Sequence, residues 1–453
     1  MKSRESAGPT RLRPPRLGSG KLDPAGPLRS GRGAALLIAG VILLGINMRT
    51  AITSLPPIFP ELQSALHLSA ATLSLLAAIP VLCFGVFSGA GAPLSRRFGE
   101  ERVLGLAVAL LAAGLLLRSL SPAALLFPGT VVAGAAIALL NVLLPSLVKR
   151  RMPERAGLII GLYLLMLSGG AIAASALAVP VFNAAGNGAS AGSASVRIAL
   201  GLWAAPAVLA AVMWLPQLRY RTVPGAPQAV QAAGVAADVP EDAAARPSGA
   251  VAMGRSALAW QVTFFMGLQS LSYYATLSWF PTMFRDRGVS AVHAGDLLAL
   301  MNLGNAVTCL LIPVLAHRAA DQRKLAVAAV AATGVGISGA IFGPAALAPG
   351  FIALLGLGQG ATLGLAIFYT MARAPDPATA ASLSAFAQGV GYLLASTGPL
   401  TIGFLHNATG GWTLPAVVLL AVAAAQLATG WLAGRALTVP AAIRHQKAVP
   451  QSG

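Results

Sequence analysis

Long hydrophobic runs, separated by short polar segments, occupy most of the chain. A helix needs about 20 predominantly apolar residues to cross the hydrocarbon core of a bilayer. Runs of that length lie at 34–58, 70–92, 102–119, 122–147, 156–182, 198–216, 256–283, 292–316, 324–344, 349–372, 379–406 and 412–434. The pattern predicts an all-α integral membrane protein with twelve transmembrane helices.

Polar segments divide these helices into two groups of six. The segment between the groups is rich in Ala and Pro and of mixed charge, which is typical of a flexible linker, and the basic start of the chain is typical of a disordered tail. The predicted domains are a disordered cytoplasmic tail (1–32), a six-helix half (33–216), a cytoplasmic linker (217–255), a second six-helix half (256–434) and a cytoplasmic tail (435–453).

Charge is scarce and unevenly distributed. Charged residues make up 10% of the chain, against roughly a quarter in an average soluble domain, and the net charge is +18. When successive connections are assigned to alternating sides of the membrane, 26 of the 31 Lys and Arg residues share a side with both termini and the linker. The positive-inside rule places that side in the cytoplasm. Membrane insertion and anionic lipid headgroups explain the basic excess, so nucleic acid is not an expected partner.

The hydrophobic runs carry little of the chemistry that enzymes need. They contain no pair of histidines and no acid placed to orient a base, and the chain has no phosphate-binding loop of the GxxxxGK[ST] type. Cys83 and Cys309 each lie in an apolar run and are interpreted as small buried hydrophobic residues. We expect no enzymatic activity, no cofactor and no metal site.

Two short segments correspond between the halves. Residues 93–99 read Pro-Leu-Ser-Arg-Arg-Phe-Gly after the second run, and residues 313–318 read Pro-Val-Leu-Ala-His-Arg after the eighth. At these positions the chain resembles the major facilitator superfamily, whose corresponding loops read Gly-x-Leu-Ala-Asp-Arg-x-Gly-Arg-Arg. Arg97, Gly99 and Arg318 match this pattern. The resemblance implies that these three residues belong to gating loops.

The acidic residue of that loop pattern has no counterpart here. Arg96 and His317 occupy its two positions. In the superfamily this Asp helps to fasten neighbouring helices at the cytoplasmic gate, so the departure argues against that ion pair in this chain.

A closer resemblance extends over both halves. It rests on the runs Gly-Ile-Asn-Met-Arg-Thr-Ala-Ile-Thr-Ser, Ala-Leu-Leu-Asn-Val-Leu-Leu-Pro-Ser-Leu-Val-Lys-Arg, Gly-Leu-Gln-Ser-Leu, Gly-Leu-Gly-Gln-Gly and Ala-Gln-Gly-Val-Gly-Tyr, at residues 45–54, 138–150, 267–271, 356–360 and 387–392. These runs look like the cyanate permease and 2-nitroimidazole transporter branch of the superfamily.

The resemblance implies a secondary carrier that moves a small solute, such as the cyanate anion, across a bacterial-type cytoplasmic membrane by alternating access. An exporter of small heteroaromatic toxicants of the nitroimidazole type is the alternative. Membrane lipid and the solute are the expected partners, and a monomer is the expected state. The direction of transport stays open.

Arg49 is the most informative single residue, because it lies within a hydrophobic run. It follows Ala34 by fifteen residues, about 22 Å along a helix in a core roughly 30 Å thick. An intramembrane Arg costs on the order of 2.5–3.5 kcal/mol at the centre of a span, so it faces the bundle interior or water. We hypothesise that Arg49 binds an anion or a carbonyl group. The alternative is a structural role, in which Arg49 reaches the outer surface or pairs with Glu61.

Hydroxyl and amide side chains within other parts of the runs are further candidates for the substrate path. Polar groups in hydrocarbon need partners, so each of them either lines a cavity or joins two helices. The predicted substrate-binding set is Arg49, Asn47, Thr53, Asn141, Gln269, Tyr273, Gln359, Gln388 and Tyr392.

Acidic residues are confined to loops and helix ends. If transport is coupled to protons, Glu61 and His406 at the outer ends of their helices are the nearest candidates, because proton carriers in membranes are usually acids or histidines. Trp279 near the end of the seventh run is predicted to belong to the aromatic belt at the membrane interface.

Overall fold

The computed structural model describes residues 32–120, 123–186, 193–219 and 253–440, and most of these residues are helical. The two predicted tails and the predicted linker lie, apart from their edges, outside the described residues.

Each predicted span corresponds to a long helix or to a pair of helices. In the first half these are α1 (Arg32–Thr53), α3 (Ala70–Phe87), α5 (Glu100–Ser119), α6 (Ala123–Arg151), α7 (Ala156–Ala185) and the pair α8 (Ser193–Gly201) and α9 (Ala204–Trp214). In the second half they are α11 (Ala257–Asp286), α12 (Ala291–Arg318), α13 (Arg323–Phe342), α14 (Ala348–Ala372), α15 (Pro377–Thr409) and α16 (Thr413–Ala433). The predicted all-helical, twelve-span fold is confirmed.

Two of these helices differ from the rest in polarity. Within the described residues, ten segments are long and apolar enough to span a membrane by length and composition alone. Helices α11 and α15 are not among them, although they contain 30 and 33 residues. Polar side chains lower their mean hydropathy, which is the pattern of helices that turn a face toward a polar interior.

Prolines end the first helix a few residues before the end of the predicted run at 34–58. Helix α1 stops at Thr53, and a 3₁₀ turn at Pro56–Ile58 leads into the short helix α2 (Phe59–Leu66). Pro56 and Pro57 have no amide hydrogen, so they cannot continue the hydrogen-bond ladder of α1. The turn redirects the chain across the end of the bundle.

The segment that carries Arg97 is a helix rather than an open loop. Residues Gly91–Phe98 form α4, and Gly99 then turns the chain directly into α5 with φ of +90°. This conformation is open to Gly and rarely to other residues. The exposed Arg97 guanidinium lies 5.2 Å from the Phe98 ring centroid, and Arg318 is the exposed last residue of α12.

Ion pairs near α4 join α5 to α6. Glu100 and Glu101 begin α5, and they pair with Arg150 at 3.8 Å and Arg151 at 4.0 Å near the end of α6. Ser146 also donates a hydrogen bond to Glu100, at 2.8 Å. Acidic side chains therefore do fasten neighbouring helices here, but they come from the start of α5.

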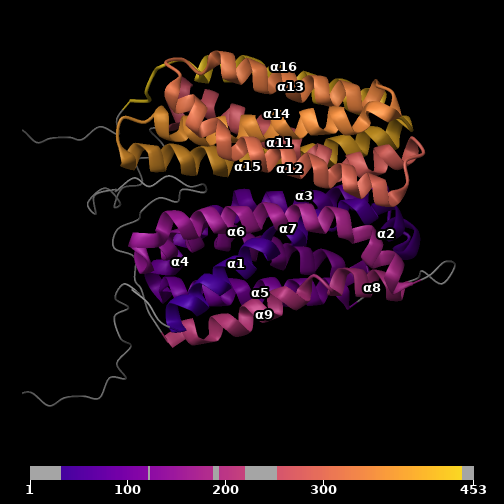
Figure 1. Cartoon of the computed structure of the whole chain (residues 1–453), viewed down its shortest axis with the longest axis horizontal. Coiled ribbons are helices and arrows are strands. Elements are labelled where there is room, and N and C mark those ends of the chain that lie inside the picture. Colours follow the sequence, from indigo (N-terminus) through magenta and orange to yellow (C-terminus); the bar gives the residue numbers. More distant parts are fainter. Residues whose placement is uncertain (1–31, 121–122, 187–192, 220–252, 441–453) are drawn as a thin grey trace, which may run out of the picture.

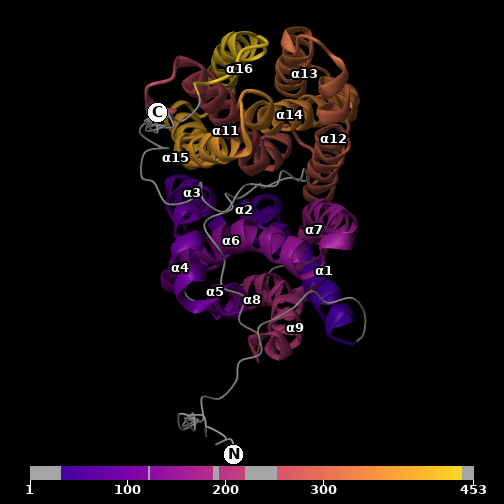
Figure 2. The ribbon, with the colours of Figure 1, turned by 90° about the vertical axis from the view of Figure 1, so that its left-hand side faces the viewer.

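The two halves form separate bundles that lie against each other. Figure 1 shows the first half below and the second half above, with their long helices roughly parallel. In Figure 2, where the helices are seen closer to end-on, α3 faces α15 and α7 faces α12 across the junction, and these two pairs make the main contacts between the halves. We call the end of the molecule that holds α4 the Arg97 end, and the end that holds α2 the Glu61 end.

Candidate functional site

Arg49 lies at the junction of the two halves. Its side chain is half-buried, and its Nη1 donates a long hydrogen bond of 3.5 Å to the Tyr274 hydroxyl on α11. The guanidinium carbon is 5.8 Å from the ring centroid of Tyr273, within the range of a cation–π interaction. Within the described residues Arg49 forms no ion pair with an acid. An intramembrane cation is thus held by aromatic groups and has capacity left for an anion.

Tyrosines are concentrated around this cation. The chain has six tyrosines. Four of them, Tyr163, Tyr273, Tyr274 and Tyr392, lie within electrostatic range of Arg49. They come from α7, α11 and α15, so both halves contribute. The arrangement offers a guanidinium together with phenol hydroxyls and flat aromatic faces, which suits a small planar solute that carries negative charge.

Asn141 and Tyr163 support the site from the first half. The Tyr163 hydroxyl donates to Oδ1 of Asn141 on α6 at 3.4 Å and lies 3.6 Å from the sulfur of Met48. Asn141 is half-buried. This pair ties α6 and α7 together beside the helix that carries Arg49.

Gln269 and Gln359 form a buried amide pair in the second half. Gln269 donates to the backbone carbonyl of Gln359 at 3.4 Å, and Gln359 donates to the Thr276 hydroxyl at 2.9 Å. Oε1 of Gln359 is buried without a hydrogen-bond partner. The two predicted amides therefore meet, and they join α11 to α14.

Three of the predicted site residues, Asn47, Thr53 and Gln388, form hydrogen bonds within their own helices. Asn47 donates to the Leu43 carbonyl at 2.8 Å, and Thr53 donates to the Arg49 carbonyl at 2.9 Å; both are fully buried. Gln388 donates to Ser384 at 2.8 Å. These contacts stabilise local helix geometry, and the buried Oδ1 of Asn47 is without a partner.

Tyr392 extends the aromatic cluster across the junction. Its ring meets Phe84 of α3 edge-to-face, with 5.7 Å between the ring centroids. Tyr392 is half-buried, so one side of the ring is packed while part of it stays accessible.

Glu61 pairs with Arg285 and not with Arg49. The two carboxylate oxygens of Glu61 accept from Nη1 of Arg285 at 2.7 and 2.8 Å. The alternative in which Arg49 pairs with Glu61 is therefore wrong. Since α2 belongs to the first half and α11 to the second, this ion pair closes the junction at the Glu61 end, where Phe59 also packs on Trp279 with ring centroids 6.0 Å apart.

Trp279 is in the packed core and not in an interfacial belt. It is 2% exposed, and its indole nitrogen donates to the Pro399 carbonyl at 2.9 Å. His406 lies near it, stacked on Trp412 with ring centroids 4.0 Å apart and 3.7 Å from Asp286. The expectation of a belt position fails because interhelix packing, which hydropathy does not encode, decides the direction of the side chain.

Arg118 also forms no ion pair with a described acid, and its surroundings differ from those of Arg49. It is 3% exposed at the end of α5, and it donates to the Ala51 carbonyl near the end of α1 at 2.7 Å. A cation at a helix C-terminus is stabilised by the helix dipole and by the free carbonyl groups. Arg118 therefore caps the last turn of α1, which ends at Thr53.

Asn302 and Ser175 form polar contacts at the junction and lie outside the predicted set of site residues. Asn302 on α12 accepts from the Tyr273 hydroxyl at 2.9 Å and donates to Ser175 on α7 at 3.2 Å. The signal was present, because Asn302 is an amide within an apolar run, as Asn141 is. Its partner on the other half could not be read from sequence.

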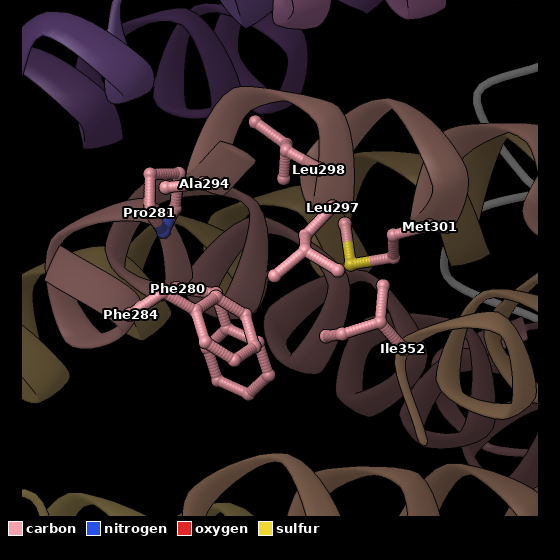
Figure 3. A pocket seen from close by; sticks show the side chains of 8 residues that line it. All are labelled: Phe280, Pro281, Phe284, Ala294, Leu297, Leu298, Met301 and Ile352. Atoms are coloured by element: carbon pink, nitrogen blue, oxygen red, sulfur yellow. The ribbon is translucent and has the colours of Figure 1, made fainter. Parts of the chain in front are cut away.

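A small crevice at the Glu61 end is entirely apolar. Figure 3 shows its lining side chains, which leave no room for even a water-sized molecule between them. The lining residues are Phe280, Pro281, Phe284, Ala294, Leu297, Leu298, Met301 and Ile352. No side chain there recognises charge, so the Arg49 cluster is the better candidate site. The described residues also contain no cluster of three or more His, Cys, Asp or Glu placed to hold a metal ion.

Known proteins resemble this chain along nearly its full length. It is 37% identical to the 2-nitroimidazole transporter of Escherichia coli (strain K12) over 406 residues, which cover 90% of this chain and 97% of that protein. It is 31% identical to the cyanate transport protein CynX of the same organism over 375 residues, covering 83% and 91%. It is also 36% identical over 400 residues to the uncharacterized transporter YycB of Bacillus subtilis (strain 168), covering 88% and 93%.

The fold matches solved transporters. The crystal structure of a bacterial homolog of the human lysosomal transporter Spinster, in an inward-facing and unoccupied conformation, superposes with a TM-score of 0.68 at 17% identity and covers 93% of this chain and 98% of that one. A family model described as Major Facilitator Superfamily matches residues 35–399. The protein is a multi-pass membrane transporter and not an enzyme. The chain belongs to the Major Facilitator Superfamily.

Proposed function

We propose that this transporter moves a small planar anion, such as cyanate, and binds it at Arg49. The observation that carries the proposal is the cation itself. Arg49 lies between the halves beside four tyrosines, and none of the described acids pairs with it. An anionic solute supplies the missing negative charge, and the phenol hydroxyls are further donors to it. The candidate residues Asn47, Thr53 and Gln388 support this site through helix geometry.

Alternating access is the proposed mechanism. The site lies at the junction of two six-helix bundles, and rocking of one half against the other exposes such a site to each side in turn. The halves are in contact at the Glu61 end through Glu61 and Arg285, so the structure corresponds to a state closed at that end. With both termini in the cytoplasm, the Glu61 end faces outward, and Arg97, Gly99 and Arg318 lie on the cytoplasmic side as gating residues.

Substrate charge removes the need for an intramembrane acid. A solute that arrives as an anion is balanced by Arg49, so its own concentration gradient drives transport, and an inside-negative membrane potential adds to the driving force for export only. Should protons be coupled, Glu61 and His406 are the side chains to test, and both bind neighbours at the Glu61 end. We propose that the carrier works as a monomer in a bacterial cytoplasmic membrane.

Export of small nitro-heteroaromatic compounds is the second candidate function. The tyrosine faces around Arg49 favour it, because aromatic rings stack on each other in offset or edge-to-face geometry. The 37% identity to a 2-nitroimidazole transporter also supports it. A nitro group presents two oxygens that carry partial negative charge, so the same arginine serves both solute classes.

Ligand binding to the purified protein tests the proposal. A ligand that binds the native state raises the melting temperature in proportion to RT ln(1 + [L]/Kd). We expect cyanate or 2-nitroimidazole to raise it in wild type, Arg49→Gln to abolish the shift, and Arg197→Gln, which changes an exposed arginine on α8, to retain it. Unchanged binding by Arg49→Gln contradicts the site. Absence of a shift with both solutes in wild type contradicts the substrate classes.

A further inference from the structure

A buried chain of hydrogen bonds connects the candidate site to the other half of the molecule. The Tyr273 hydroxyl donates to Oδ1 of Asn302 at 2.9 Å, and Nδ2 of Asn302 donates to the Ser175 hydroxyl at 3.2 Å. The three side chains are 6%, 4% and 0% exposed. Since Tyr273 and Asn302 belong to the second half and Ser175 to the first, the chain runs from the ring beside Arg49 across the junction.

The helices that carry this chain touch backbone to backbone. A Cβ atom built on Gly295 would lie 2.6 Å from the Ser175 carbonyl oxygen, closer than real Cβ contacts come. Gly295 and Asn302 are seven residues apart in α12, which places them on the same face of the helix. One face of α12 therefore contacts Ser175 at two points. Gly295 packs against its backbone carbonyl, and the Asn302 amide donates to its hydroxyl.

Asn302 is in a position to respond when these helices separate. Its Nδ2 also donates to the Leu298 carbonyl at 3.0 Å, so the amide is fixed on three sides. If the halves part at the Glu61 end, Ser175 leaves with α7 and one of the three contacts is lost. The amide can then rotate, and the Tyr273 hydroxyl is released next to Arg49.

We infer that Asn302 is a positioning residue that couples the Arg49 site to closure of the Glu61 end. While that end is closed, Ser175 orients the Asn302 amide, and the amide holds the Tyr273 hydroxyl. When that end opens, the hydroxyl becomes available as a donor beside Arg49. The inference rests on the proposed site at Arg49, but the coupling between Tyr273 and the junction does not depend on which solute is carried.

Distances between the halves test this coupling without any solute. Spin labels are attached through Gln63→Cys and Val292→Cys, two exposed positions at the Glu61 end, one in each half, in a background with Cys83→Ser and Cys309→Ser. Pulsed electron resonance on the full chain in lipid nanodiscs then gives the populations with short and long distances. Each variant is measured twice, once with Gly295 present and once combined with Gly295→Ala. The long-distance population is expected to be larger in the Gly295→Ala background.

We expect Ser175→Ala and Tyr273→Phe each to raise the ratio of long to short distances by about threefold to tenfold, the range for one buried hydrogen bond. The double variant should show no more than either single one, because both break the same chain. Tyr273→Phe keeps the ring beside Arg49 and loses only the hydroxyl. Thr130→Ala is the matched control, since the buried Thr130 hydroxyl donates only within α6, to Leu126 at 2.7 Å, and should change nothing.

A Tyr273→Phe distribution identical to wild type in both backgrounds, with Ser175→Ala shifted, overturns the coupling and leaves Ser175 as a packing contact. Additive shifts in the double variant overturn it as well. Binding of cyanate or 2-nitroimidazole is measured separately. If the proposed site is wrong, Arg49→Gln binds the solutes as wild type does while the distance results stay as expected. If the coupling is wrong, only the distance results differ from those expected.

Discussion

Arg49 and Arg285 are both arginines that reach across the junction, and their surroundings are opposite. Arg285 binds the Glu61 carboxylate at 2.7 and 2.8 Å, whereas Arg49 has a 3.5 Å contact with the Tyr274 hydroxyl and an aromatic face at 5.8 Å. The first cation is neutralised by the protein. The positive charge of Arg49 has no acidic partner among the described residues, so it can be neutralised by a bound anion. By this difference Arg285 is a residue that joins the halves, and Arg49 is one that binds a solute.

The energies support this division. A partly exposed ion pair such as Glu61–Arg285, with side-chain exposures of 16% and 25%, contributes only about 0.2–1 kcal/mol. An unpaired Arg within a span costs on the order of 2.5–3.5 kcal/mol on insertion scales. A structural role for Arg49 would offer no compensation for that cost, because its protein contacts are few and long. Arg118 shows the structural solution, a short bond to a helix-end carbonyl.

The largest effect is expected from exchanging Arg49 for lysine, with the same exchange at Arg285 as the comparison. Arg49→Lys keeps the charge but loses the planar fork of donors, so solute flux into proteoliposomes should fall about 10- to 100-fold, the value of one charge-assisted hydrogen bond of about 1.5–3 kcal/mol. Arg285→Lys should retain flux within about twofold, because an ammonium group still pairs with Glu61. Initial rates over a range of solute concentrations give kcat and KM for both variants.

Equal losses in the two lysine variants would remove the distinction between a solute site and a junction contact. Correct insertion of each variant is checked beforehand by its melting temperature and its elution as a single species. The exposed Arg197→Lys provides the baseline for any arginine-to-lysine change.

A smaller effect is expected at the glycine contact between the halves. Gly295→Ala places a methyl group against the Ser175 carbonyl, because an ideal Cβ on residue 295 would lie 2.6 Å from the carbonyl oxygen. The clash is relieved only if α7 and α12 move apart. Overpacking of this kind costs about 1–3 kcal/mol, so the population of the closed state at the Glu61 end, relative to the open state, should fall about fivefold or more. Gly350→Ala on α14, where no atom lies within 4 Å of the built Cβ, is the control. Spin-label distances measure both, and a closed fraction unchanged by Gly295→Ala would refute the contact.

Much of the fold could be predicted from the hydrophobic pattern. The pattern gives all twelve spans, including α11 and α15, whose polar residues lower their hydropathy. The predicted run continues past the end of α1, which stops at Thr53 because Pro56 and Pro57 lack the amide hydrogens that would extend the helix. The break between α8 and α9 and the helical state of α4 escape prediction, since both depend on packing against neighbouring helices.

The candidate site was predictable in its chemistry and not in its pairings. Arg49 is recognisable as a candidate because a charged residue is unusual in an apolar run. Gln269 and Gln359 are recognisable for the same reason, through their amide groups. Sequence spacing gives depth in the membrane but not direction around the bundle axis. For that reason Glu61 could be assigned to Arg49 instead of Arg285, and the link from Tyr273 through Asn302 had no signal beyond the residue type.

The smallest effect is expected from reversing the ion pair at the Glu61 end. Glu61→Gln removes one charge of a pair worth about 0.2–1 kcal/mol, so the open population at that end should rise only about twofold to fivefold. Glu61→Arg combined with Arg285→Glu should restore the wild-type distances, because the attraction is the same in either direction.

The single variant Glu61→Arg, in which two cations face each other, is the control and should open that end further. A double variant as open as the single one would show that Arg285 acts through contacts other than Glu61. Solute binding at Arg49 should be the same in the restored double variant as in wild type. The reason is that Arg285 acts by pairing with a side chain of the protein, whereas Arg49 acts by binding the solute.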